Sequence, residues 1–120
     1  MAEFTRVCAL SDLESRSAKR VAVGGETMAI VRTDDGVFAV QDRCSHADVS
    51  LAEGEVDGHT IECWLHGSAF DVRNGWPLSL PAVEPIATYQ TRVVGEGAGA
   101  AVEVNPFPVR LHGAGPAAFN

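Results

Sequence analysis

Short β-like runs, separated by glycine-bearing turns, extend along most of the chain. Residues 4–8 alternate between apolar and polar, as a half-buried strand does, and Gly24-Gly25 between two further runs indicates a hairpin turn. Residues 11–14 have the capping pattern of a short helical turn. The pattern predicts strands at residues 4–8, 18–23, 27–32, 37–40, 54–56, 59–62, 69–72, 86–94 and 101–104. Many short strands at this spacing are typical of an antiparallel sandwich or barrel, so the predicted fold class is all-β.

The length and composition fit one small domain that can build its own core. The chain has 120 residues, of which 46% are hydrophobic and 21% charged, as in ordinary globular proteins. The last residues, 106–120, are rich in Pro, Gly and Ala and weakly patterned, which predicts a mobile C-terminal tail. An apolar run of the roughly 18 residues that span a bilayer does not occur, so we expect no membrane association. The first ten residues lack the pattern of a secretory signal, which favours a cytoplasmic protein.

The net charge of −7 lies almost entirely in one central segment. Sixteen acidic residues against nine basic ones argue against a nucleic-acid partner, because the chain would repel phosphates. Seven of the acidic residues fall within 42–71, where Arg43 is the single basic residue. The same segment holds two of the three cysteines and three of the four histidines. The charge therefore gathers around the residues with the most obvious metal-binding chemistry.

Those residues form two short boxes, Cys44-Ser45-His46 and Cys63-Trp64-Leu65-His66, with sixteen residues between them. If the predicted hairpin between the boxes brings them together, two thiolates and two imidazoles face one small volume. A structural zinc ion accepts such a set, but zinc sites usually take two cysteines from one loop and two histidines from another. Here each box supplies one of each. That alternation favours a binuclear iron–sulfur cluster, with both thiolates on one iron and both imidazoles on the other, while zinc remains the alternative.

The two boxes resemble those of Rieske [2Fe-2S] ferredoxins, the small electron carriers of bacterial multicomponent aromatic-ring dioxygenases. The resemblance covers about residues 3–104. It implies that Cys44 and Cys63 bind the inner iron of one [2Fe-2S] cluster per chain, and that His46 and His66 bind the outer, solvent-facing iron.

The resemblance also implies a domain organisation. We expect a Rieske-type antiparallel β-sandwich over residues 1–105, with a small inserted cluster-binding lobe at about 42–81. Residues 106–120 then form the tail.

The residues around the boxes bear on the reduction potential. Neutral imidazole ligands make a Rieske cluster easier to reduce than a plant-type ferredoxin. High-potential respiratory relatives carry an extra cysteine in each box, but Val49 and Leu65 stand near those places here. Those relatives also have a tyrosine donor where this chain has Phe70, although Ser68 remains able to donate to a bridging sulfide. The resemblance therefore implies a low to intermediate potential.

Five further residues near the boxes or elsewhere in the chain need an interpretation. Trp64 either shields the cluster from water or contacts a partner, and Pro81 matches the loop that covers the cluster in this family, with a simple turn as the alternative. Cys8 is expected to be a buried, reduced thiol rather than a ligand. We expect His59 to be solvent-exposed beside a turn, and His112 to lie in the tail, both without a functional role.

The resemblance implies a one-electron carrier rather than an enzyme, since the chain lacks the residues for a second, catalytic iron. Its expected partners are a flavin-containing, NAD(P)H-dependent ferredoxin reductase and a terminal Rieske-type oxygenase. We expect a monomer whose acidic lobe meets basic docking surfaces. Two alternatives stay open, namely a Rieske ferredoxin that accompanies iron–sulfur cluster assembly and a zinc-binding interaction module.

Overall fold

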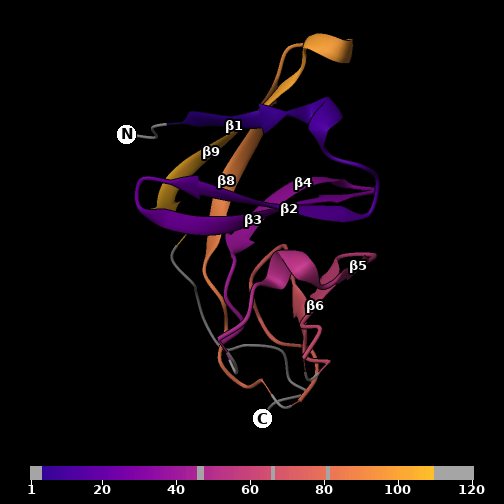
Figure 1. Ribbon diagram of the computed structural model, residues 1–120, viewed down its shortest axis with the longest axis vertical. Helices are drawn as coiled ribbons and strands as arrows, with labels where there is room; N and C mark the ends of the chain where they lie inside the picture. Colours follow the sequence, from indigo (N-terminus) through magenta and orange to yellow (C-terminus); the bar gives the residue numbers. More distant parts are fainter. Residues whose placement is uncertain (1–3, 46–47, 66, 81, 110–120) are drawn as a thin grey trace.

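The computed structural model describes residues 4–45, 48–65, 67–80 and 82–109. Within them, the strands form two antiparallel sheets, and single-turn 3-10 helices lie in the connections between strands (Figure 1). The strands are β1 (Thr5–Ala9), β2 (Ser17–Val23), β3 (Glu26–Thr33), β4 (Gly36–Gln41), β5 (Glu55–Asp57), β6 (Thr60–Glu62), β7 (Ala69–Asp71), β8 (Thr88–Val94) and β9 (Ala101–Pro108). The 3-10 helices are η1 (Leu10–Asp12), η2 (Leu51–Glu53) and η3 (Gly97–Gly99). The prediction of an all-β, antiparallel fold is confirmed.

The larger sheet has six strands in the order β1-β9-β8-β4-β3-β2. Its first and last strands, β1 and β2, contact each other, so the sheet is strongly curled. Gly24 and Gly25 form the two-residue turn between β2 and β3, and both have positive φ angles, as the hairpin prediction requires. The curled sheet provides a rigid base for the segment that leaves it after β4.

The smaller sheet, β5-β6-β7, belongs to a segment inserted between β4 and β8. We call this segment, residues 42–87, the lobe. In Figure 1 it extends below the larger sheet, so that the chain leaves the base through one connection and returns through another. The expectation of a small inserted lobe agrees with this arrangement.

Strand β3 is buried on both faces because the curled sheet packs on one side of it and the lobe on the other. Met28 and Ile30 point into the core of the curled sheet, whereas Ala29 and Val31 pack against the lobe. Alternate residues of a strand face opposite sides, so this single strand contributes to two hydrophobic clusters. The cluster between sheet and lobe includes Cys44 and Cys63. The two candidate cysteine ligands therefore lie at the interface that holds the lobe in place.

Two local predictions need correction. Strand β9 continues to Pro108, past the expected end at residue 104, and it pairs with Tyr89 beyond an irregularity in the β8–β9 register. The weak pattern there arises because Pro106 and Pro108 have no N–H group, which makes a paired strand resemble a loop in sequence. The helical turn begins at Leu10 instead of residue 11, and the Asp12 carboxylate accepts the Ala9 N–H at 3.0 Å. Residues 110–120, which include His112, lie outside the described residues.

Within the part of the chain that the structure describes, there is no helix long and apolar enough to cross a membrane.

Candidate metal centre

The first box follows β4 in a loop that is closed at its base. The Cys44 N–H donates to the Val49 carbonyl at 3.1 Å, and the Leu51 N–H donates to the Asp42 carbonyl at 3.0 Å. The side chain of Gln41 adds a further tie, since its Nε2 donates to the Arg43 carbonyl at 2.8 Å. These bonds fix the backbone on both sides of Cys44.

The second box follows β6 in a tighter loop. The Cys63 N–H donates to the Ser68 carbonyl at 2.7 Å, and the Gly67 N–H donates back to the Cys63 carbonyl at 2.9 Å. This reciprocal pair closes the loop between the end of β6 and the start of β7. Cys63 is therefore held by main-chain bonds alone, independently of its thiol.

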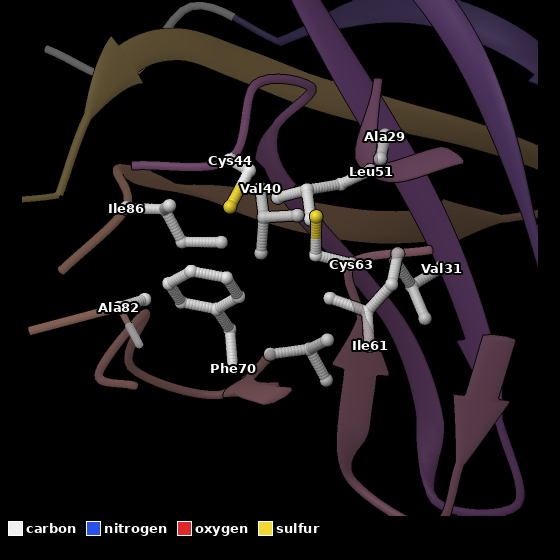
Figure 2. Packing of buried hydrophobic residues seen from close by; sticks show 11 residues of the cluster. Ala29, Val31, Val40, Cys44, Leu51, Ile61, Cys63, Phe70, Ala82 and Ile86 are labelled. Carbon is white, nitrogen blue, oxygen red and sulfur yellow. The ribbon is translucent and has the colours of Figure 1, made fainter. Parts of the chain in front are cut away.

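The two thiols lie in the same hydrophobic cluster, although they are nineteen positions apart in sequence. Figure 2 shows both sulfur atoms within this cluster, where Phe70, Leu51 and Ile86 surround them. Two buried thiolates in such apolar surroundings are costly unless positive charge compensates them. Iron supplies that charge and favours soft thiolate ligands, so this pair of donors fits a [2Fe-2S] cluster.

A third loop, residues 78–86, is hydrogen-bonded through serine hydroxyls to the first box and to the residues that follow the second box. Ser45 Oγ donates to the Glu84 carbonyl at 2.6 Å. Ser68 Oγ accepts the Ala82 N–H at 3.0 Å, and Ser79 Oγ accepts the Ala69 N–H at 2.9 Å. The three loops are thus one hydrogen-bonded unit. Pro81, which the sequence places in this third loop, lies outside the described residues, as do the predicted ligands His46 and His66.

Ser68 is fully buried, beside the hydrophobic cluster that contains the two thiols. Its oxygen accepts a hydrogen bond from the Ala82 N–H, and this leaves its own hydroxyl proton available for a second acceptor. The neighbouring aromatic ring, Phe70, carries no such donor and is also fully buried. Ser68 is therefore the better placed of these two residues for a hydrogen bond to a sulfide.

Trp64 is 53% exposed, so about half of its surface is open to solvent. Four other large apolar side chains on the second and third loops share this exposure. Together the five residues, which we call the apolar tip, are Trp64, Leu65, Leu78, Leu80 and Val83. An exposed apolar group of this kind on a small protein is typical of an interaction surface.

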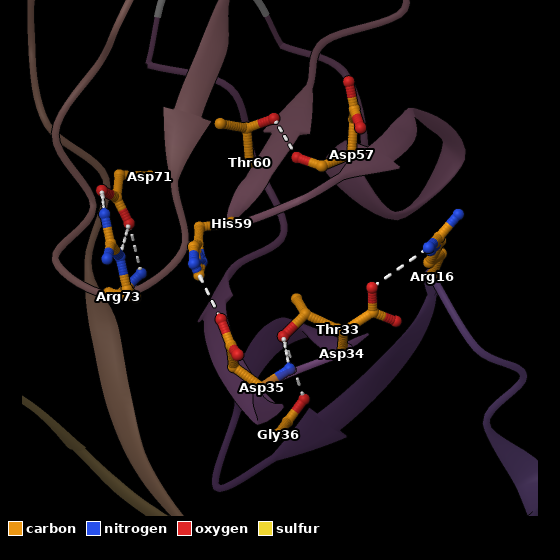
Figure 3. Close-up of polar contacts among 10 residues, drawn as sticks. All are labelled: Arg16, Thr33, Asp34, Asp35, Gly36, Asp57, His59, Thr60, Asp71 and Arg73. Atoms are coloured by element: carbon orange, nitrogen blue, oxygen red, sulfur yellow. Dashed lines mark hydrogen bonds and ion pairs between the residues drawn. The ribbon is translucent and has the colours of Figure 1, made fainter.

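His59 differs from its sequence interpretation, because it is only partly exposed and contacts a carboxylate. Its Nε2 lies 2.7 Å from a carboxylate oxygen of Asp35 in the β3–β4 turn, and the imidazole is 33% exposed (Figure 3). Close by, Arg73 binds the Asp71 carboxylate through two hydrogen bonds. Burial alone would raise the pKa of Asp71, but these hydrogen bonds and the charge of Arg73 outweigh it and lower that pKa. The His59–Asp35 contact thus joins the lobe to the larger sheet.

Cys8 lies in the core of the curled sheet and not in the lobe, as the sequence predicts. Burial and the charge of Asp12 raise the pKa of its thiol, so Cys8 stays protonated and unreactive at neutral pH.

The fold and the two buried thiols define an all-β metal-binding protein, and comparison with known proteins identifies its family. The family model described as the Rieske [2Fe-2S] domain matches residues 3–90. This chain belongs to the Rieske [2Fe-2S] family. Ferredoxin CarAc of Metapseudomonas resinovorans is 40% identical over 91 residues, which are 75% of this chain and 85% of the relative. The ferredoxin component of biphenyl 2,3-dioxygenase from Rhodococcus jostii is 36% identical over 93 residues, 78% of this chain and 87% of the relative.

A solved structure gives the same result. One chain in the complex of reduced oxygenase and oxidized ferredoxin in carbazole 1,9a-dioxygenase matches with a TM-score of 0.79 and 37% identity. The match covers 89% of this chain and 96% of that chain. The protein is accordingly an electron carrier of the Rieske ferredoxin type with a [2Fe-2S] cluster, similar to ferredoxin components and not to catalytic subunits. The predictions of cofactor and of an electron-transfer role are confirmed, and the zinc alternative is set aside.

Proposed function

We propose that this protein accepts one electron from a flavin-containing, NAD(P)H-dependent ferredoxin reductase and passes it to a terminal Rieske-type, aromatic-ring-hydroxylating oxygenase. The names of its relatives support this role, since they include ferredoxin components of biphenyl and anthranilate dioxygenases. The solved complex of a ferredoxin with its oxygenase supports direct docking between such proteins. None of these relatives is named as part of a cluster assembly system, which leaves that alternative without support here.

Within this proposal, Cys44 and Cys63 bind the inner iron, and His46 and His66 bind the outer iron. The burial of both thiols in one hydrophobic cluster supports the first half of the assignment. The bound cluster supplies the chemistry, which is the gain and loss of one electron. The protein holds the thiols at fixed places, keeps water from them with apolar side chains and brings one edge of the lobe to the surface.

We also propose a low to intermediate reduction potential. Phe70 cannot donate a hydrogen bond to a ligand sulfur, while the hydroxyl of the buried Ser68 can donate to a sulfide. Val49 and Leu65 leave no bridging disulfide between the two boxes. The negative charge of the lobe also lowers the reduction potential, because reduction places one more electron in an already negative region.

The observation that carries the proposal is the apolar tip, whose residues lie on the loop of the second box and on the third loop bonded to it. Exposed acidic side chains stand elsewhere on the lobe, at Asp48, Glu53, Glu55, Asp57 and Glu62. A protein–protein interface usually combines an apolar core with a polar rim, and the lobe exposes side chains of both kinds. We propose that partners cover the apolar tip and present basic residues to the acidic ones. Trp64, with the largest exposed ring of the set, then contributes most to binding.

The test is electron transfer from the reduced protein to the oxygenase of carbazole 1,9a-dioxygenase, followed by stopped-flow absorption. Trp64→Ala is expected to lower the second-order rate constant by about tenfold, as truncation of a central aromatic contact does. The matched control is Phe107→Ala, which removes a similarly exposed ring from β9, outside the lobe, and should leave the rate unchanged. Rates with an NAD(P)H-dependent reductase should fall as salt rises. Equal rates for the two variants would contradict docking at the apolar tip.

Three further features belong to the proposal. The Rieske domain spans residues 1–105, with a cluster-binding lobe at about 42–81 and a tail at 106–120, although β9 continues to Pro108. The protein acts as a monomer in the cytoplasm. The free thiol of the buried Cys8 is in keeping with that reducing compartment.

A further inference from the structure

A buried carboxylate closes the base of the loop that carries Cys44. The side chain of Asp42 is 2% exposed, accepts two hydrogen bonds and forms one ion pair. Its Oδ1 accepts the Ala52 N–H at 2.8 Å, its Oδ2 accepts the Ser50 hydroxyl at 2.6 Å, and Arg20 Nε lies 3.2 Å from Oδ2. A buried carboxylate is stable only with such a set of donors, so Asp42 is fully paired.

These contacts span the loop and attach it to the larger sheet. Asp42 stands two residues before Cys44, while Ser50 and Ala52 stand on the far side of the loop. Arg20 comes from β2, which is the edge strand of the larger sheet. One carboxylate therefore joins the start of the loop, its end and a distant strand.

The two charges of this ion pair differ in their exposure to water. The Arg20 side chain is 63% exposed, so solvent and salt screen its positive charge. The Asp42 carboxylate is buried, and its field reaches its neighbours through protein of lower dielectric constant. The net electrostatic effect of the pair on a nearby group is therefore negative.

We propose that Asp42 and Arg20 are a pair of positioning residues that hold the Cys44 loop and adjust the reduction potential of the cluster in opposite directions. The charge of Asp42 opposes the arrival of an electron, and the charge of Arg20 favours it. The inference rests on the proposed function in one respect, because it takes Cys44 as a ligand of the cluster.

The experiment compares Asp42→Asn, Arg20→Gln and the double variant in the full chain with its cluster. Reduction potentials are measured by redox titration followed by EPR. We expect Asp42→Asn to raise the potential and Arg20→Gln to lower it by a smaller amount, with the double variant between the two. Both single variants should also speed amide hydrogen exchange in residues 42–52, since each breaks a contact of the loop. A merely structural role would shift both potentials in the same direction.

The matched control is Arg92→Gln together with Glu103→Gln, which removes the exposed ion pair between β8 and β9. That pair lies outside the lobe, so its loss should leave the potential unchanged. Unchanged potentials in both Asp42→Asn and Arg20→Gln, or shifts of the same sign, would overturn the proposal. If Asp42→Asn fails to retain the cluster, the lowered potential of Arg20→Gln still tests it. A wild-type protein without a reversible cluster signal would instead refute the proposed function.

Discussion

Replacing Cys63 by serine is expected to abolish binding of the cluster. The Cys63 thiol is buried in the same hydrophobic cluster as that of Cys44, and the described residues of this cluster provide no other soft ligand. A serine hydroxyl keeps its proton at neutral pH and is a hard donor, so it replaces a thiolate on iron poorly. We expect the visible absorption per protein chain to fall below about one tenth of the wild-type value.

The control for this experiment is Cys8→Ser. Cys8 is buried too, but in the core of the curled sheet, and its thiol has no role in the proposed site. This variant should lose some stability, because a hydroxyl replaces a buried thiol, and should keep its full visible absorption. Normal absorption in Cys63→Ser, or a complete loss in Cys8→Ser, would contradict the ligand assignment.

Replacing Gly54 by alanine is expected to destabilise the lobe by about 3 kcal/mol, because a methyl group at this residue overlaps the backbone carbonyl of Glu62. Gly54 links η2 to β5, and Glu62 ends β6 just before Cys63. Its φ of −86° is available to any residue, so the cost comes from the close approach of two backbone segments. Because backbone cannot move aside as a side chain can, the loop that carries Cys63 must shift.

Gly58→Ala separates this effect from a simple loss of glycine. Gly58 has a φ of 58° in the β5–β6 turn, and an added Cβ there meets nothing within 4 Å. The expected cost is only the about 1–2 kcal/mol of a left-handed residue. Free energies of unfolding from denaturant titrations, with cluster absorption as a second readout, measure both variants. A Gly54→Ala variant no less stable than Gly58→Ala would show that the close approach is absent.

The strands of this fold could be predicted from the sequence because their signals are local. The short β-like runs of β2, β3 and β4 and the Gly24-Gly25 turn are properties of neighbouring residues, and the structure confirms them. The end of β9 could not be predicted in the same way. Pro106 and Pro108 remain in a paired strand because β8 lies beside them, and that contact is not visible in the local pattern.

The site, too, has one part that the sequence predicts and one part that depends on tertiary contacts. The spacing of Cys44 and Cys63 identified the thiols, and the structure places both in one hydrophobic cluster. The supporting contacts join residues far apart in sequence. Asp42 binds Arg20, and Ser45 binds the Glu84 carbonyl, but neither pair has a sequence signal that predicts the partner. The acidic residue shortly before the first box is visible in the sequence, but nothing local identifies Arg20 as its partner.

His59 shows why exposure is hard to predict for a polar residue beside a turn. Its turn is close to the β3–β4 turn only in the folded protein, where Asp35 provides a partner. The sequence contains both residues but no indication that the two turns meet. Burial of a polar side chain depends on such a partner, and so it is a property of the tertiary structure.

The central claim is that the lobe holds a [2Fe-2S] cluster with two cysteine and two histidine ligands. The EPR spectrum of the purified protein after chemical reduction tests this claim most directly. We predict the rhombic signal of a reduced Rieske cluster, with a lower average g value than that of a cluster held by cysteines alone. Absence of this signal in a colourless protein with stoichiometric zinc, or the signal of an all-cysteine cluster, would contradict it.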